Sequence, residues 1–415
     1  MVLYGKGVMG LKRIFSKLFV LYMCLFSLLL LLSCNNNSIK TSESNSVITE
    51  PIVANEPKEC SIVAAGDLVM HMPVVESAYD STTGTYNFDS LFYNVKDYIT
   101  NSDLAICNSE TSYLKDQSSF TGYPCFSSPT ALLPSLKNNG FDVLTSAHNH
   151  TLDQGVEGFN STFNALTSND FDVLGIKNNA IDKNYIIKDL NGIKVGITDY
   201  TYSETDNLGN KTLNGIPIPS ELEGRINAFD FSTIDKDLQN IKSTLEAMKN
   251  DGAEFTIFYI HWGNEYESLP SSDQEHLASA LNSYGLDVII GSHPHVVQPI
   301  RTITNEVSGK KTLVCYSLGN FISNQSQETI GKVRSEDGLM VKLNIYKDSN
   351  NNVSLKSHET KPTWVYKYTD TNGKLCYTIL SIEELLQTDE GKNYAQEVFN
   401  QAQNSYSATE STINS

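Results

Sequence analysis

From residue 59 onward, short apolar runs alternate with longer amphipathic stretches. Apolar runs of about four to eight residues are typical of buried strands, and longer amphipathic stretches favour helices. Strands are predicted at Ile62–Ala65, Leu104–Cys107, Phe141–Thr145, Phe171–Leu174, Lys194–Asp199, Phe255–Ile260, Leu286–Ile290 and Thr312–Tyr316. Helices are predicted over 129–139, 155–168 and 272–284. This alternation predicts an α/β domain with a largely parallel, buried sheet.

The pattern changes after about residue 338. Polar and apolar residues alternate over Leu339–Tyr346 and Val353–Lys356, which favours antiparallel strands. The segment beyond about 395 is rich in Ser, Asn, Gln and Thr, and we expect it to be disordered. The chain is therefore divided into an α/β domain over 59–325, a small β-rich C-terminal extension over 326–394 and a disordered tail over 395–415.

The first 33 residues have the composition of a targeting segment. Residues 1–17 contain four Lys and Arg, no acidic residue occurs before Cys34, and Phe19–Leu32 is an apolar run. The run is shorter than the roughly 20 residues of a comfortable membrane span. Because Cys34 follows directly on Ser33, the segment resembles a bacterial lipoprotein signal, with Cys34 as the lipidated first residue of the mature protein. An uncleaved signal anchor is the alternative, and both place the protein outside the cytoplasm, attached to the cell membrane.

The rest of the composition narrows the class of protein. Residues 34–58 are rich in Asn, Ser, Thr and Glu and suit a flexible tether. The chain has 48 acidic and 30 basic residues, and without residues 1–33 the basic residues fall to 26, for a net charge of −22. Such a charge excludes a general nucleic-acid binder, because affinity for phosphate backbones depends on Lys and Arg. Five cysteines besides Cys34 remain in the mature chain, without a CxxC pair, which does not indicate a disulfide framework.

Chemically active side chains follow five of the predicted strands. They are Asp67 after 62–65, Glu110 after 104–107, Asn149 and His150 after 141–145, His261 and Glu265 after 255–260, and His293 and His295 after 286–290. In open α/β sheets, ligands bind outside the carboxyl ends of the strands, where the loops converge. The clustering therefore predicts a metal site assembled from loops.

The donor set limits the metal and suggests a chemistry. Asp67 and Glu110 offer anionic oxygens, either of which could bridge two ions, Asn149 offers a carbonyl, and the histidines offer imidazoles. Oxygen and nitrogen donors without thiolate suit one or two ions of Mn, Fe or Zn. Two ions about 3.5–4 Å apart would hold a phosphoester, and His150 would protonate the leaving oxygen. Asp153 and Glu265 complete the candidate catalytic set, with the alternative that Asp153 only caps the next helix. His293 and His295 could point to one side of an extended segment.

Six motifs occur in order along the predicted domain. They are Gly66-Asp67, Asn108-Ser109-Glu110, Ala147-His148-Asn149-His150-Thr151-Leu152-Asp153-Gln154-Gly155, His261-Trp262-Gly263-Asn264-Glu265-Tyr266, Gly291-Ser292-His293-Pro294-His295-Val296 and Tyr316-Ser317-Leu318-Gly319-Asn320-Phe321. Over about residues 60–325 the series resembles the capsule-synthesis CapA family, which is implicated in poly-γ-glutamate capsule formation. The resemblance implies the calcineurin-like metallophosphoesterase superfamily and its fold, a four-layer α-β-β-α sandwich.

The resemblance also implies site residues. It places metal ligands at Asp67, Glu110, Asn149, His261, His293 and His295, and the superfamily's catalytic histidine at His150. Three positions depart from the pattern. Asp67 is not followed by the usual Asp-x-His histidine, Glu110 stands in place of Asp, and His148 replaces an Asn. The number of ions and the hydrolytic activity stay open.

Three functions are compatible with these observations. The resemblance favours a surface lipoprotein that acts in synthesis or export of poly-γ-glutamate or another envelope polymer, with a membrane synthase complex as partner. The alternatives are a metal-dependent hydrolase of a phosphoester or envelope polymer unrelated to capsule, and a catalytically inactive polymer-binding protein. Because the domain is strongly acidic, we expect its contact with a polyanion to depend on divalent metal.

Overall fold

The computed structural model describes residues 55–115, 119–388 and 394–415. The predicted signal segment, Cys34 and most of the predicted tether therefore lie outside the described residues. Within the described residues, no helix is both long and apolar enough to cross a membrane.

The first large sheet has a parallel half and an antiparallel half. Its strand order is β21-β20-β19-β1-β4-β7-β8, and β18 pairs with β1. The strands are β1 (Lys58–Leu68), β4 (Leu104–Ser109), β7 (Val143–Thr145), β8 (Asp172–Leu174), β18 (Asn320–Ile322), β19 (Asp337–Lys347), β20 (Val353–Thr369) and β21 (Leu375–Ser381). Strands β1, β4, β7 and β8 are parallel, so their carboxyl ends meet at one edge.

The second large sheet has a parallel centre, β10-β14-β15-β17, with antiparallel strands at its margins. Its order is β12-β11-β10-β14-β15-β17-β16, and β9 and β13 also pair with β10. The strands are β9 (Tyr185–Leu190), β10 (Ile193–Thr205), β11 (Lys211–Leu213), β12 (Ile216–Pro217), β13 (Ala228–Asp230), β14 (Phe255–His261), β15 (Val288–Ser292), β16 (Ile300–Thr304) and β17 (Lys311–Cys315). Two short pairs, β2 (Tyr79–Asp80) with β3 (Thr85–Tyr86) and β5 (Ser112–Leu114) with β6 (Ser127–Pro129), lie outside both sheets.

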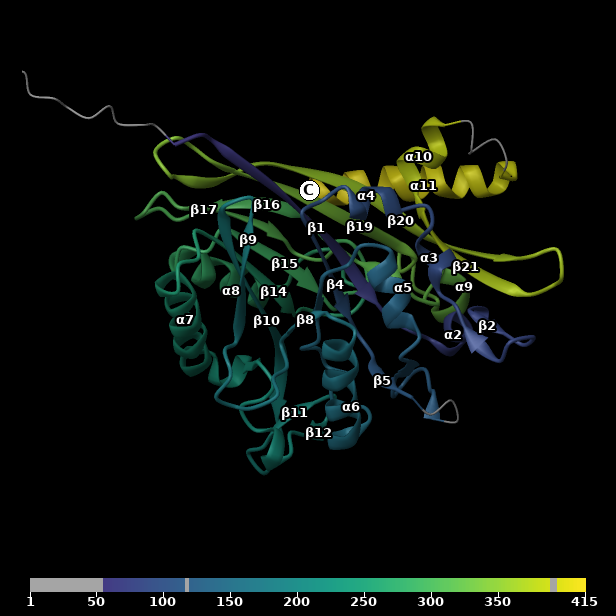
Figure 1. The fold of residues 1–415 in the computed structure, drawn as a ribbon, viewed down its shortest axis with the longest axis horizontal. Coiled ribbons are helices and arrows are strands. Elements are labelled where there is room, and N and C mark those ends of the chain that lie inside the picture. The colour runs from purple at the N-terminus through teal and green to yellow at the C-terminus, as the bar shows by residue number, and fades with distance from the viewer. Residues whose placement is uncertain (1–54, 116–118, 389–393) are drawn as a thin grey trace, which may run out of the picture. The chain divides into compact units, whose positions relative to one another are not determined.

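The described residues form ten α-helices. They are α2 (Met72–Ser77), α3 (Asp89–Phe92), α4 (Lys96–Thr100), α5 (Leu132–Asn138), α6 (Gly155–Ser168), α7 (Ile234–Asn250), α8 (Ser272–Ser283), α9 (Gln327–Ile330), α10 (Ile382–Gln387) and α11 (Gln396–Ile413). Figure 1 shows α7 and α8 beside the second sheet, on the side away from α5.

Three apolar clusters establish the layers. Alternate residues of β1 point to opposite faces: Val63 packs in a cluster with α2–α5, whereas Ile62 packs between the two sheets. The outer face of the second sheet packs against α7 and α8, with Phe258 in that cluster. The order is therefore helix, sheet, sheet, helix, which confirms the four-layer α-β-β-α sandwich.

The predicted elements agree closely with the structure as far as residue 325. All eight predicted strands overlap observed strands, and the helix predicted over 155–168 coincides with α6. The antiparallel strands predicted after 338 are also present, as β19 and β20. However, β19 pairs along β1, so the C-terminal strands complete the first sheet.

The expected disorder of 395–415 is wrong, because α11 occupies Gln396–Ile413. The helix buries Ala402, Ser405 and Ile413, and the Ser405 hydroxyl donates to Asp337 Oδ1 at 2.6 Å. Its inward positions are mostly small or polar, so the composition hid the helical periodicity.

Candidate metal centre

Five strand ends bring the predicted ligands together. Asp67 lies near the end of β1 and pairs in register with Asn108 of β4, and Glu110 follows directly after β4. His261 ends β14, and His293 follows directly after β15, the parallel neighbour of β14. The loop after β7 supplies Asn149. All six predicted ligands are buried, none more than 4% exposed.

The described side chains form two groups with metal-ligand spacing. One consists of Glu110, His293 and His295, and the other of Asp67, Glu110 and His261, with the ligand atoms of each group within 4.8 Å of one another. Glu110 belongs to both groups. A carboxylate shared in this way is suited to bridge two ions.

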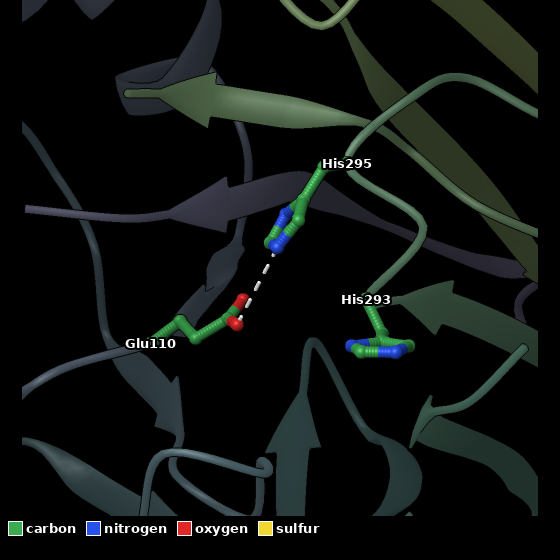
Figure 2. A group of neighbouring side chains, drawn as sticks. All are labelled: Glu110, His293 and His295. Atoms are coloured by element: carbon green, nitrogen blue, oxygen red, sulfur yellow. Dashed lines mark ion pairs between the residues drawn. The ribbon is translucent and has the colours of Figure 1, made fainter. Parts of the chain in front are cut away.

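Glu110 points toward imidazoles from two directions. Its Oε1 lies 3.8 Å from His295 Nε2 and 3.7 Å from His261 Nε2. Figure 2 shows the Glu110 carboxylate and the His295 ring facing each other, with the His293 ring beside them. Within the described residues, Glu110 Oε1 and His293 Nδ1 are buried without a hydrogen-bond partner. Such orphaned atoms are costly unless a cation fills the space between them, so the residues present fit a divalent metal ion.

Asn149 extends the second group. Its Oδ1 lies 2.8 Å from His261 Nε2, so the amide oxygen and the ring nitrogen can meet one ion. On the other side of the His261 ring, Nδ1 contacts the Ser292 hydroxyl at 3.0 Å. That contact leaves Nε2 as the nitrogen that faces Glu110 and Asn149.

His293 and His295 are held differently from the extended arrangement that the sequence suggested. Strand β15 ends at Ser292, and the two histidines have φ angles of 96° and 56°. Residues other than glycine rarely adopt this left-handed backbone region. Backbone strain of this kind is typical of functional sites. The period-two geometry of a strand therefore does not aim these rings. The backbone N–H of His293 donates to Asp67 Oδ2 at 3.1 Å, which ties this loop to β1.

Burial and mutual proximity shift the pKa values of the cluster. Burial raises the pKa of Glu110 well above its usual range, although His295 opposes this effect. Burial and then the neighbouring His293 hold the pKa of His261 far below its usual value. Burial would also lower the pKa of His295, but the Glu110 and Asp67 carboxylates outweigh it and raise the pKa to about 9. Opposed shifts within one buried cluster are typical of functional sites.

The three candidate catalytic residues have different surroundings. His150 Nδ1 lies 2.8 Å from Asp153 Oδ2, which also accepts from the Phe126 backbone N–H at 2.6 Å. Asp153 therefore orients His150, and the N-cap position of α6 is occupied by Gln154, whose side chain makes no capping bond. Glu265, by contrast, is exposed on the loop after β14 and lies outside the buried cluster. The catalytic roles of all three stay predictions.

Two asparagines that contact the ligands were not among the predicted site residues. Asn108 Nδ2 donates to Asp67 Oδ1 at 2.9 Å and to Glu110 Oε2 at 3.3 Å, which holds the two carboxylates together. Asn320 Oδ1 lies 3.1 Å from His295 Nδ1. Both residues occur in the motifs quoted above, Asn108 near the carboxyl end of β4 and Asn320 at the first position of β18, and their place in those motifs is the signal that could have identified them.

His148, which replaces the Asn of the family pattern, is 1% exposed, and its Nδ1 has no hydrogen-bond partner among the described residues. Burial, followed by the charge of His150, lowers the pKa of His148 to about 3. The described metal-ligand groups do not include it.

Comparisons with known proteins assign the family. The sequence model of the bacterial capsule synthesis protein PGA_cap matches residues 61–325, more than half of the chain. The chain is 28% identical over 300 residues to the capsule biosynthesis protein CapA of Bacillus anthracis, covering 71% of this chain and 66% of that protein. It is 28% identical over 237 residues to the PGA biosynthesis protein CapA of Bacillus subtilis (strain 168), covering 56% and 55%. The chain thus spans less than two thirds of the length of either relative.

Two solved structures resemble the fold only distantly. The protein TT1561 of Thermus thermophilus has a TM-score of 0.34 at 9% identity and covers 73% of this chain and 98% of its own. Purple acid phosphatase PPD1 from yellow lupin (Lupinus luteus) has a TM-score of 0.33 at 12% identity, with 73% and 53% covered. Neither likeness supports an inference about this chain. The family match over residues 61–325 does support one. Two relatives of the chain are named CapA, and the chain belongs to the bacterial capsule synthesis family PGA_cap.

Proposed function

We propose that this chain acts at the cell surface in the synthesis or export of poly-γ-glutamate or a related acidic envelope polymer, through a divalent metal centre at its strand ends. Family membership supports the link to capsule. The observation that carries the metal centre is Glu110, a fully buried carboxylate that both ligand groups share and whose Oε1 has no hydrogen-bond partner within the described residues.

The residues that would hold metal are Asp67, Glu110, Asn149, His261, His293 and His295. Their oxygen and nitrogen donors suit one or two ions of Mn, Fe or Zn. When bound, such ions polarise a phosphoryl or carbonyl oxygen and lower the pKa of water. Around that position, Asn108 and Asn320 hold the ligands in place through their contacts with Asp67 and His295.

The charge of the protein shapes the test of polymer binding. With residues 1–33 removed, 26 basic residues stand against 48 acidic ones, so an acidic polymer is repelled unless cations lie between them. We expect the purified protein to bind poly-γ-glutamate in the presence of Mn²⁺ and to lose binding in EDTA, measured by calorimetry. The variant Asp67→Ala/His293→Ala should not bind in either condition. Equal binding by the chelated and metal-loaded proteins would contradict the proposal.

A metal-dependent hydrolase is the second candidate, and the contact between His150 and Asp153 favours it. With Nδ1–H donating to Asp153 Oδ2, Nε2 is the ring nitrogen left for proton exchange, and in the doubly protonated ring Nε2–H can give its proton to a leaving oxygen. A phosphoester screen with the metal-loaded protein should then show turnover that His150→Ala abolishes. The matched control is His358→Ala, because His358 is exposed on β20. Absence of turnover in a metal-loaded protein that still binds the polymer would favour the inactive polymer-binding alternative.

The attachment to the membrane is part of the same proposal. Lipidation of Cys34 would hold the protein on the outer side of the cell membrane, near a membrane synthase complex. Cys34→Ser should move the protein from the membrane fraction to the soluble fraction. Retention of this variant in the membrane fraction would favour an uncleaved anchor.

A further inference from the structure

A side chain outside the predicted site fixes one of the predicted metal ligands. Asn149 Nδ2 donates to Asn214 Oδ1 at 3.0 Å, while Asn149 Oδ1 lies 2.8 Å from His261 Nε2. We propose that Asn214 is a positioning residue that keeps the Asn149 amide oxygen turned toward the metal centre. This inference rests on the metal centre proposed above.

The orientation of this amide decides whether Asn149 can bind metal. A carboxamide presents an oxygen with lone pairs on one side and an NH₂ group on the other, and only the oxygen is a ligand. A half turn about the last side-chain bond would exchange them. Because Asn214 Oδ1 is an acceptor, it pairs with the NH₂ group and disfavours the exchanged orientation. Outer contacts of this kind orient metal ligands in many proteins.

The same Asn214 amide reaches the neighbouring candidate catalytic residue. Asn214 Nδ2 lies 3.4 Å from His150 Nδ1, which is closer to Asp153 Oδ2 at 2.8 Å. Because His150 Nδ1–H donates to Asp153 Oδ2, the Asn214 NH₂ group cannot also donate to that nitrogen, and the bond to Asn149 alone carries the proposal.

The hairpin that carries Asn214 is anchored to the loop it contacts. Asn214 and Gly215 connect β11 and β12, with φ angles of 49° and 73°. An Asn-Gly pair with positive φ is the favoured two-residue turn of a β-hairpin. Leu213, which is 1% exposed, lies in one apolar cluster with Leu152 and Phe159. The packing of Leu213 thus places the turn directly over the loop that contains Asn149 and His150.

A simpler explanation is that Asn214 is present only because a turn needs a residue that tolerates positive φ. Two substitutions separate the explanations. Asn214→Gly satisfies the turn and removes the amide, whereas Asn214→Asp keeps an oxygen acceptor for Asn149. The matched control is Asn351→Gly, since Asn351 is an exposed residue with a φ of 66° between β19 and β20.

The experiment is calorimetric titration of the EDTA-stripped full-length protein with MnCl₂ and ZnCl₂. We expect Asn214→Gly to weaken metal binding by about 10- to 100-fold, the usual effect of losing an outer contact to a ligand. Asn214→Asp should restore most of the affinity, and Asn351→Gly should match the wild type. Thermal unfolding of the stripped proteins should show that Asn214→Gly still unfolds cooperatively, at a somewhat lower Tm because the buried Asn149 NH₂ group has lost its acceptor.

Several results would overturn the inference. Wild-type affinity in Asn214→Gly, or an equal loss in Asn351→Gly, would show that the amide positions nothing. A failure of Asn214→Asp to recover affinity would show that the acceptor is not the important feature. If the wild-type protein bound neither metal, both this inference and the proposed metal centre would fail, which distinguishes that outcome from the first two.

Discussion

Glu110→Gln changes the one side chain common to both candidate metal groups while preserving its shape. Burial is the largest influence on the pKa of Glu110 and disfavours its charged form. A Gln amide can turn its oxygen to Asn108 Nδ2, but its NH₂ group then faces two ring nitrogens that carry protons. His261 Nε2 donates to Asn149 Oδ1, and the pKa of His295 is raised to about 9. Without metal, the variant should therefore be less stable than the wild type, because its buried NH₂ group lacks an acceptor.

With metal the difference should widen. An ion at 100 times its Kd stabilises the native state by about 2.7 kcal/mol. For about 360 residues the entropy of unfolding is near 0.8 kcal/mol/K, so Tm should rise by about 3–4 °C in the wild type. The variant lacks the shared anionic ligand and should show a much smaller rise. Thermal unfolding followed by circular dichroism, in EDTA and in Mn²⁺, measures both effects. A variant that is as stable as the wild type in EDTA, or that keeps the full rise in Mn²⁺, would refute the reasoning.

Two further predictions concern the backbone and the support of the site. A Cβ at Gly66 would lie 2.1 Å from the Gly319 carbonyl oxygen. Gly66→Ala should therefore lower the free energy of unfolding in urea by about 1–3 kcal/mol and weaken metal binding at the adjacent Asp67. Unchanged stability would show that the close approach is not required. Asp199 Oδ2 accepts from the backbone N–H groups of Ser146 and Ala147, yet burial raises the pKa of Asp199 from 3.8 to about 8. Between these two pH values the native state keeps the Asp199 carboxyl protonated, whereas the unfolded state does not. The contribution of Asp199 to the free energy of unfolding is therefore fully present below pH 4 and falls by on the order of 5 kcal/mol as the pH rises to 8. In EDTA, the stability of Asp199→Asn relative to the wild type should increase over that range, and a pH-independent difference would contradict the assignment.

Much of the fold could be predicted because its strands are buried on both faces. Runs such as Phe255–Ile260 are apolar at almost every position, and the helix over 155–168 follows a clear helical period. The C-terminal helix α11 was missed because it buries Ala402, Ser405 and Thr409, small or polar residues without a hydrophobic signal. The pairing of β19 with β1 was missed too, since register between distant segments is not encoded in local pattern.

The site shows the same division. Asp67 and His261 could be predicted as site residues because each follows an apolar run that predicts a strand. The left-handed backbone of His293 and His295 could not be predicted, since it depends on tertiary contacts such as the bond from His293 N–H to Asp67. Asn214 lies in a short hairpin remote from the motifs, and only the packing of Leu213 brings it to Asn149.

The central claim is that the strand ends bind metal through Asp67, Glu110 and the three histidines. Elemental mass spectrometry of the purified protein, beside Asp67→Ala/His293→Ala, tests it most directly. We expect near-stoichiometric Mn, Fe or Zn in the wild type and its loss from the double variant. A wild-type protein that holds no metal even after reconstitution, or a double variant with unchanged metal content, would contradict the claim.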